Sequence, residues 1–228
     1  NYALSLGFDL IATGHYAKKV NLKNIQLHIP KDKNKDQTYF LYMLNEQVLK
    51  RTLFPLENLD KSEVKSIAKG MNLGLENKKE SMGICFIGKR KFSSFIDNYV
   101  KPIEGPIVDY KSNKKISHHK GLSKYTIGQR KGINIGGMKD SKDSPWYVID
   151  KDVGTNALIV SQNQSPLYYT GEIDLENTNI INEEFNHTNI KVRFRHGGTL
   201  RCCELNKDKN KYSITLNEEE RGIAQGQA

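Results

Sequence analysis

Cys85 is the residue in this sequence with the strongest potential for covalent chemistry. It lies in the segment 80–91, ESMGICFIGKRK, between Gly83 and Gly88, and three cations close the segment. The glycines allow the backbone to turn sharply on both sides, which predicts that the sulfur lies in a loop. Cysteine attacks electrophiles and carries sulfur as the thiolate, and nearby positive charge favours that form. Cys85 is therefore our candidate nucleophile.

A purely structural role for Cys85 is the competing interpretation. The residue stands in the apolar run 84–87, and a small cysteine in such a run commonly packs in a core. Against this, five cations flank the thiol and Glu80 is the one acid among them. The five are Lys78, Lys79, Lys89, Arg90 and Lys91. This charge pattern suits both a thiolate and an RNA substrate.

Four further motifs accompany the Cys85 segment along the chain. They are Gly14-His15-Tyr16-Ala17, Lys35-Asp36-Gln37-Thr38-Tyr39-Phe40-Leu41, Gly128-Gln129-Arg130-Lys131-Gly132 and Pro145-Trp146-Tyr147-Val148-Ile149-Asp150-Lys151-Asp152. In order and approximate spacing, the five together resemble the tRNA-specific 2-thiouridylase family. The resemblance extends from about Gly7 to the last residue.

The resemblance implies an α/β plus β fold. Residues 1–101 would be the remainder of an ATP pyrophosphatase-type (adenine nucleotide alpha hydrolase-like) parallel-sheet domain that carries the Cys85 loop. Residues 102–165 would form a central small β domain, and residues 166–228 an incomplete, barrel-like β domain. The residue pattern agrees, because Pro102 and Pro106 precede a change from helical periodicity to short strand-like runs.

Local patterns predict the elements of the first part. A helix tail at 2–6 ends at Gly7, and an apolar run at 8–12 predicts a buried parallel strand. Weak alternation over 18–30 predicts a hairpin, and periodic apolar residues predict a later helix over 92–100.

Gly14 and His15 fall at the carboxyl end of the predicted strand 8–12, where open α/β sheets bind their ligands. A glycine at this place admits close approach of a nucleotide, although it would equally serve to make the turn. A lone histidine is more often a hydrogen-bonded structural residue than a binding group.

Two helices are predicted between residues 40 and 74. Apolar residues at 40, 41, 44 and 48 predict the first, whose amino terminus would present Lys35, Asp36 and Gln37 to a phosphate or sugar. Without a partner, the same polar segment would be a solvated connection. Asp60 and Glu63 form a capping box that opens the second helix, and its apolar stripe predicts a core-facing side.

Strand-like runs dominate after Pro106. They occupy residues 107–110, 115–119, 125–127, 146–149 and 157–160. Gly128, Gly132, Gly136 and Gly137 are predicted to make turns, because their spacing is not that of a phosphate-binding loop. His118 and His119 stand among lysines, which predicts an RNA-facing or solvated basic edge.

Residues 190–195 alternate between apolar and basic side chains, which predicts a strand with a packed face and a free basic face. The basic face would be either solvated or in contact with RNA. Cys202 and Cys203 are predicted to be packing residues on the next strand.

The resemblance also implies roles for individual residues. Cys85 matches the catalytic cysteine that carries a persulfide, and Gly14 matches a contact to ATP. The implied tRNA contacts are His15, Lys35, Asp36, Gln37, Arg193, Phe194 and Gln227.

The implied activity is ATP-dependent 2-thiolation of the wobble uridine of tRNA. AMP from ATP makes the C2 oxygen a leaving group, and a persulfide on cysteine divides a difficult substitution into easier steps. ATP with Mg²⁺ is the implied cofactor; tRNA and a sulfur-relay protein or other persulfide donor are the implied partners. A partner cysteine and a pyrophosphate-binding Ser-Gly-Gly-x-Asp-Ser loop belong upstream of Asn1. We therefore expect a fragment, inactive by itself.

Composition agrees with this function without specifying it. The chain has 35 Lys and Arg against 26 Asp and Glu, a formal charge of +9, which suits a nucleic-acid partner or a lysine-rich solvated surface. Three cysteines without a disulfide framework indicate a reducing compartment, and no apolar run has membrane-spanning length. We expect the cytoplasm, with an organelle left open. Two other functions stay open: another ATP-pyrophosphatase-type ligase or synthetase, and a non-catalytic RNA-binding remnant.

Overall fold

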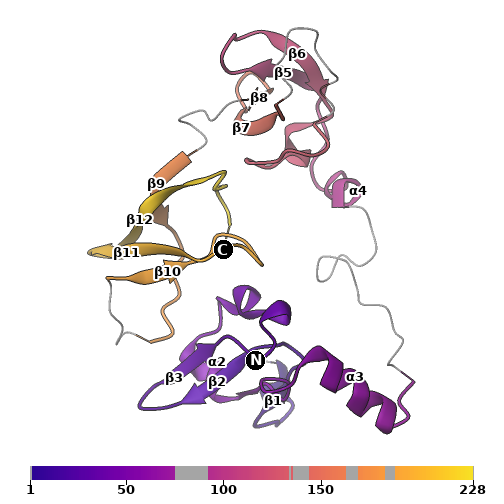
Figure 1. Ribbon diagram of the computed structural model, residues 1–228, viewed down its shortest axis with the longest axis vertical. Coiled ribbons are helices and arrows are strands. Elements are labelled where there is room, and N and C mark those ends of the chain that lie inside the picture. Colours follow the sequence, from indigo (N-terminus) through magenta and orange to yellow (C-terminus); the bar gives the residue numbers. More distant parts are fainter. Residues whose placement is uncertain are drawn as a thin grey trace. The chain divides into compact units, whose positions relative to one another are not determined.

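The computed structural model describes residues 2–74, 92–133, 135, 144–162, 169–182 and 188–227 (Figure 1). The chain divides into two compact units. The first combines residues 1–79 with 172–217, and the second combines residues 80–171 with 218–227. The predicted Cys85 loop lies outside the described residues.

The first unit begins with α1 (Tyr2–Ser5), and Gly7 follows with a φ of +83°. β1 (Ile11–Ala12) then pairs in parallel with β4 (Thr52–Leu53). β2 (Lys18–Asn21) and β3 (Ile25–His28) form the predicted antiparallel hairpin. The helix end, the parallel pairing and the hairpin are thus confirmed.

The prediction of a buried strand over residues 8–12 is wrong in length and burial. β1 covers two residues, and Phe8, Leu10 and Ile11 are exposed. Among the described residues β1 pairs with β4 alone, and a two-stranded sheet offers too little surface to cover its own faces.

The single helix predicted over residues 40–48 is also wrong. Two 3₁₀ helices, Lys33–Lys35 and Thr38–Leu41, precede a short α2 (Glu46–Lys50). The side chain of Asn45 accepts a hydrogen bond from the backbone N–H of Val48 at 3.0 Å, which starts α2 afresh. Of the four predicted apolar positions, Leu41 joins the core cluster of Ala17, Leu49 and Phe54, and Leu44 packs against it, whereas Phe40 and Val48 are exposed.

α3 (Lys61–Gly70) carries the predicted capping box of Asp60 and Glu63. Its apolar stripe is not a core face, since Ile67 and Met71 are exposed. The helix predicted over 92–100 is shorter than expected, because α4 spans Phe92–Ile96. For α3, the capping box therefore predicted correctly where the helix begins, whereas the apolar periodicity did not predict a buried side.

The central sheet belongs to the second unit and has the order β6-β5-β8-β7. Its strands are β5 (Gly105–Asp109), β6 (Lys115–His119), β7 (Tyr147–Asp152) and β8 (Ala157–Ser161). β5 and β8 are parallel, whereas the other pairs are antiparallel. Four of the five predicted strands are confirmed. Tyr125–Ile127 is not a strand, because it follows the 3₁₀ helix Leu122–Lys124 and inserts Tyr125 into the core.

Gly128 and Gly132 have φ values of +85° and +78°, so their predicted turn role is confirmed, whereas Gly136 and Gly137 lie outside the described residues. His119 corrects the predicted basic edge, because its side chain is fully buried. Its Nδ1 accepts from the backbone N–H of Gly121 at 3.0 Å, so Nε2 carries the proton and donates to the carbonyl of Asn156 at 2.9 Å.

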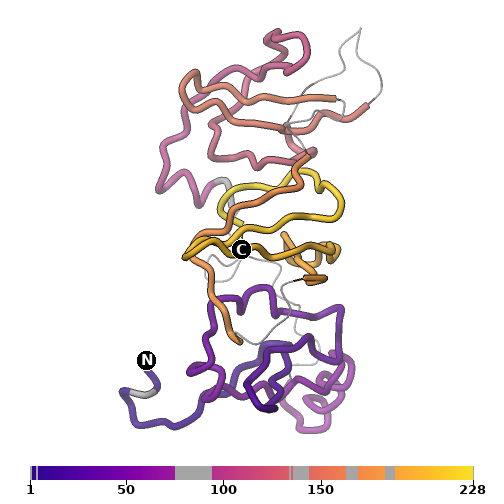
Figure 2. Tube along the Cα trace, turned by 90° about the vertical axis from the view of Figure 1, so that its left-hand side faces the viewer, coloured from indigo at the N-terminus to yellow at the C-terminus, as the bar shows by residue number. Residues whose placement is uncertain are grey.

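The C-terminal sheet has the order β10-β11-β12-β9. Its strands are β9 (Tyr169–Leu175), β10 (Ile190–Val192), β11 (Arg201–Asp208) and β12 (Lys211–Arg221). β11 and β12 form an antiparallel hairpin, which Figure 2 shows near the yellow end of the tube. On β11, Cys203 is buried as predicted, whereas Cys202 is exposed. Burial raises the pKa of the Cys203 thiol.

Candidate nucleic-acid interface

Residues 13–16 leave the carboxyl end of β1 and contain two of the predicted site residues. The backbone N–H of Thr13 donates to the carbonyl of Leu53 at 3.1 Å, which extends the parallel pairing. Nδ1 of His15 lies 2.6 Å from Oγ1 of Thr13, so the ring is held in a fixed orientation. Gly14 does not have a positive φ, and a Cβ added to it would meet no atom within 4 Å. Its backbone is therefore open to close approach.

Gln37 connects this segment to residues 31–41, which we call the Lys35 loop. The backbone N–H of Gln37 donates to the carbonyl of Tyr16, and the backbone N–H of Tyr16 donates to Oε1 of Gln37, both at 3.0 Å. The side-chain oxygen of Gln37 is thus used inside the protein. This pair of bonds fixes the Lys35 loop beside His15.

Asp36 is the most buried residue of the Lys35 loop, with 5% of its surface exposed. Its Oδ1 accepts from the N–H and Oγ1 of Thr38 at 3.0 and 2.6 Å, and its Oδ2 accepts from Nη1 of Arg193 at 2.8 Å. Burial raises the pKa of Asp36, but the hydrogen bonds from Thr38 and Arg193 outweigh it and hold the pKa below its usual range. The carboxylate is therefore ionised and directed into the protein.

Arg193 and Phe194 follow β10 and meet the Lys35 loop across 157 positions of sequence. Only 20% of the Arg193 side chain is exposed, so the prediction of a free basic face is wrong at this residue. The carbonyl of Phe194 accepts from the hydroxyl of Tyr39 at 3.1 Å. Two predicted tRNA-binding motifs are thus joined by one ion pair and one hydrogen bond.

The structure places most of the predicted site residues, but not all of them, in one connected part of the first unit. His15, Lys35, Asp36, Gln37, Arg193 and Phe194 lie in this connected part of the first unit, and Gly14 is adjacent in sequence to His15. Gln227 is exposed and belongs to the second unit. Cys85 and its flanking cations lie outside the described residues.

Sequence reasoning missed Thr38 and Tyr39 as the residues that hold this arrangement. Thr38 was detectable, because an Asp followed two positions later by a hydroxyl residue is typical of a turn closed by the aspartate side chain. The role of Tyr39 had no sequence signal, since its partner Phe194 is 155 positions away.

Some cations of the first unit have structural roles. Nζ of Lys19 donates to the carbonyls of Leu49 and Thr52 at 3.1 and 2.7 Å. Nζ of Lys31 pairs with Asp60 and Glu63 at 3.0 and 2.9 Å. The net charge of the chain therefore overstates the positive charge that this unit can offer to a polyanion.

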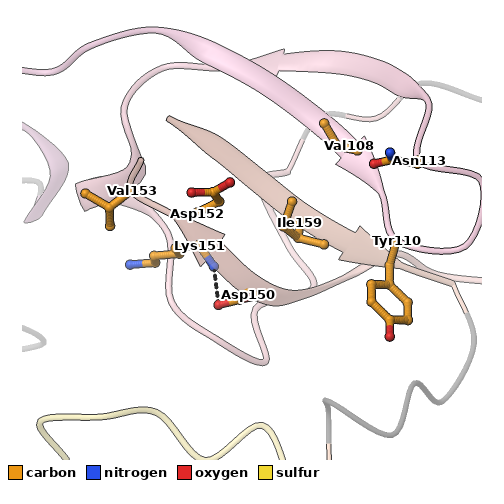
Figure 3. Close-up of a pocket in the computed structure, with 8 residues that line it drawn as sticks. All are labelled: Val108, Tyr110, Asn113, Asp150, Lys151, Asp152, Val153 and Ile159. Atoms are coloured by element: carbon orange, nitrogen blue, oxygen red, sulfur yellow. Dashed lines mark hydrogen bonds between the residues drawn. The ribbon is translucent and has the colours of Figure 1, made fainter. Parts of the chain in front are cut away.

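The central sheet contains an open pocket of about 660 Å³, which none of the predicted site residues lines (Figure 3). Lys151 and two acids share it, and Oδ1 of Asp150 accepts from the backbone N–H of Lys151 at 2.7 Å. Burial lowers the pKa of Lys151. The lining includes no cysteine, serine or histidine, and we assign the pocket no chemistry.

No group of three or more His, Cys, Asp or Glu side chains within the described residues could hold a metal ion. No helix within them has the length and apolar character needed to cross a membrane.

Three family models match consecutive parts of the chain. A tRNA methyl transferase HUP domain matches residues 1–89, and a tRNA methyl transferase PRC-barrel domain matches residues 93–162. An aminomethyltransferase beta-barrel domain matches residues 170–228. These matches confirm the predicted fold class, an α/β domain of HUP type followed by two small β domains.

Curated relatives match over almost the whole chain. The tRNA-specific 2-thiouridylase MnmA of Blochmanniella floridana is 43% identical over 230 residues, which cover 98% of this chain and 62% of the relative. The protein of the same name from Pseudomonas entomophila is 39% identical over 241 residues, covering 100% of this chain and 62% of the relative. The chain thus spans less than two thirds of the length of these relatives.

Proposed function

This chain belongs to the tRNA-specific 2-thiouridylase family, and from that premise we propose that the whole protein transfers sulfur to C2 of the wobble uridine of tRNA. The observation that carries the proposal is the linkage of residues 13–16, the Lys35 loop and residues 193–194 by hydrogen bonds and one ion pair. These segments are distant in the sequence, and a large folded RNA is the kind of substrate that needs a surface assembled from such segments.

Within this interface we assign different roles to neighbouring residues. His15, Lys35, Gln37, Arg193, Phe194 and Gln227 are proposed tRNA contacts. Asp36 is proposed as a positioning residue for tRNA binding, because both carboxylate oxygens are occupied and a buried negative charge would repel phosphate. Its function would be to orient Arg193 and to hold the Lys35 loop against residues 193–194.

ATP with Mg²⁺ is the proposed cofactor, and the described residues fit a nucleotide near Gly14. This residue follows the carboxyl end of a parallel strand, and no atom lies within 4 Å of the place where its Cβ would be. When bound, ATP would supply AMP as the leaving group that takes the C2 oxygen. Gly14 would admit the nucleotide, and His15, held by Thr13, would face the tRNA.

Cys85 is proposed as the carrier of the transferred sulfur, on the strength of its motif and its five flanking cations. Its persulfide would deliver the terminal sulfur to C2. A second cysteine elsewhere in the whole protein would attack the inner sulfur of the persulfide and form a disulfide with Cys85, which breaks the persulfide S–S bond and leaves the terminal sulfur on C2 as AMP departs with the oxygen. A thiol reductant would then reduce that disulfide, and a sulfur-relay protein or another persulfide donor would reload the free Cys85 thiol. A cytoplasmic location fits the bacterial origin of the relatives.

Replacement of the thiol in the full-length protein tests this proposal. Cys85→Ser should abolish 2-thiouridine, measured by mass spectrometry of nucleosides from the tRNA, and should leave tRNA binding nearly unchanged, since phosphate contacts dominate such interfaces. Cys202→Ser is the matched control, because Cys202 is exposed on β11 and should be dispensable. Thiolation by Cys85→Ser at the wild-type rate would exclude Cys85 as the carrier. A wild-type protein that binds tRNA and never thiolates it would indicate the RNA-binding remnant.

A further inference from the structure

Three rings form a partly exposed cluster, with Tyr39 and Phe40 on the Lys35 loop and His196 on the turn after Arg195; we call these three residues the aromatic platform. The ring of Phe40 lies 4.6 Å from that of His196 between centroids, at an angle of 37°. Tyr39 meets the edge of Phe40 at 5.5 Å and 85°. Phe40 nevertheless keeps 52% of its surface exposed. A large apolar ring is thus held in one place without being covered.

Both segments that carry these rings have fixed backbones. Tyr39 donates its hydroxyl to the carbonyl of Phe194, and the backbone N–H of Phe40 donates to the carbonyl of Gln37 at 3.1 Å. His196 occupies a turn that the N–H of Gly198 closes on the carbonyl of Arg195 at 2.9 Å. Gly197 has a φ of +69° in that turn, a conformation that other residues rarely adopt. The rings are therefore pre-organised, which lowers the entropy lost on binding.

The surroundings of the platform favour a nucleobase over an apolar protein surface. Arg195 precedes His196 in the sequence; burial raises the pKa of Tyr39, and the positive charge of Arg195 opposes that rise. Lys35 belongs to the same loop as Phe40. Exposed aromatic rings with cations next to them are the usual means of binding unpaired bases, with the ring stacked on the base and the cation near the phosphate.

We propose that the aromatic platform, through Phe40 and His196, stacks on an unpaired base of the tRNA, in addition to the contacts proposed for Lys35, Gln37, Arg193 and Phe194. The inference rests on the proposed function, because that function identifies the RNA. Stacking involves no charge on Phe40, so its contribution should be separable from phosphate contacts by its insensitivity to salt.

The test uses the full-length protein and substrate tRNA. Phe40→Ala should weaken binding about 10-fold, the effect of losing one stacked base, without changing the slope of log affinity against log salt concentration. Phe40→Trp should bind at least as tightly as wild type, because it keeps a ring. Leu22→Ala is the control, since Leu22 is 67% exposed on the β2–β3 turn and carries no ring; it should bind normally.

Tryptophan fluorescence gives a second readout that a merely structural role would not change. The emission that Phe40→Trp adds to the wild-type signal should be quenched by tRNA, whereas that added by Leu22→Trp should not. Unchanged affinity of Phe40→Ala overturns the platform and leaves the proposed function intact. A lower salt slope, or loss of sulfur delivery at normal tRNA affinity, also overturns it, since either would mean that Phe40 positions cations or binds a protein donor. A wild-type protein that neither binds nor thiolates tRNA refutes the proposed function itself.

Discussion

The central sheet and the Lys35 loop are held together by different kinds of interaction. Ile107, Val148, Leu158 and Val160 are fully buried in the central sheet and form an apolar core. The Lys35 loop instead depends on the Asp36–Arg193 ion pair and on bonds from Tyr16, Gln37 and Tyr39. Burial of apolar side chains stabilises a fold but does not fix the orientation of individual groups. Buried hydrogen bonds and ion pairs do fix orientation, although they add little net stability. Most of the proposed binding residues lie in or next to the Lys35 loop, where directional hydrogen bonds and an ion pair, not apolar burial, fix the side chains.

The largest expected loss of stability comes from a mutation in the apolar core of the central sheet. Leu158→Ala should lower the free energy of unfolding by about 4 kcal/mol, because it removes a fully buried side chain from the middle of the sheet. Chemical denaturation of the full-length protein measures this loss. Val153→Ala, at an exposed site in the same unit, should have little effect. A loss below 1 kcal/mol for Leu158→Ala would show that the core is not close-packed.

Sequence patterns predicted the two regions with different success, for the same physical reason. Short strand-like runs separated by turn residues are a local signal, so four strands of the central sheet were predicted from local sequence alone. Local sequence cannot report the pairing of Asp36 with Arg193, which are 157 positions apart. It also misplaced His119, because a buried histidine and an exposed one look alike until their hydrogen-bond partners are known. The helix predicted over 40–48 failed where Asn45 competed for the backbone.

Of the candidate site, the sequence supplied the motifs and the structure supplied their connection. Residues 13–16, 35–37 and 193–194 were all singled out by resemblance, and hydrogen bonds now link them. The division into three domains, the role of Cys85 and the individual tRNA contacts stay predictions.

The next largest loss of stability is expected from a mutation of the polar bonds that hold the Lys35 loop. Asp36→Asn should lower the free energy of unfolding by about 2 kcal/mol at neutral pH, because it weakens charge-assisted hydrogen bonds to a buried carboxylate. Addition of Arg193→Ala to this variant should cost less than Arg193→Ala costs in wild type, since the shared ion pair is already lost. Strict additivity in this double-mutant cycle, measured by chemical denaturation, would contradict the coupling.

The same pair predicts a dependence on pH. The pKa of Asp36 in the folded protein lies below its ordinary value, so the stabilisation is fully present above the unfolded pKa of about 3.9 and disappears as pH falls through the folded pKa. The stability difference between wild type and Asp36→Asn should therefore be constant from neutral pH to about pH 5 and shrink in more acidic solution. If this stability difference vanished between pH 7 and 5, a titratable group other than Asp36 would be responsible for the pH dependence.

The smallest effect sharpens the distinction between binding and positioning within the interface. Lys35→Ala should reduce the slope of log tRNA affinity against log salt concentration by about one unit, as expected when one phosphate contact is lost. Arg193→Ala should change the slope by less, because Asp36 already balances the Arg193 charge, yet it should still weaken binding by releasing the Lys35 loop. Asp36→Asn should resemble Arg193→Ala in affinity, since both break the same link. Titrations at several salt concentrations measure all three. If Arg193→Ala and Lys35→Ala reduce the slope equally, Arg193 offers its full charge to phosphate, and its pairing with Asp36 gives way when tRNA binds.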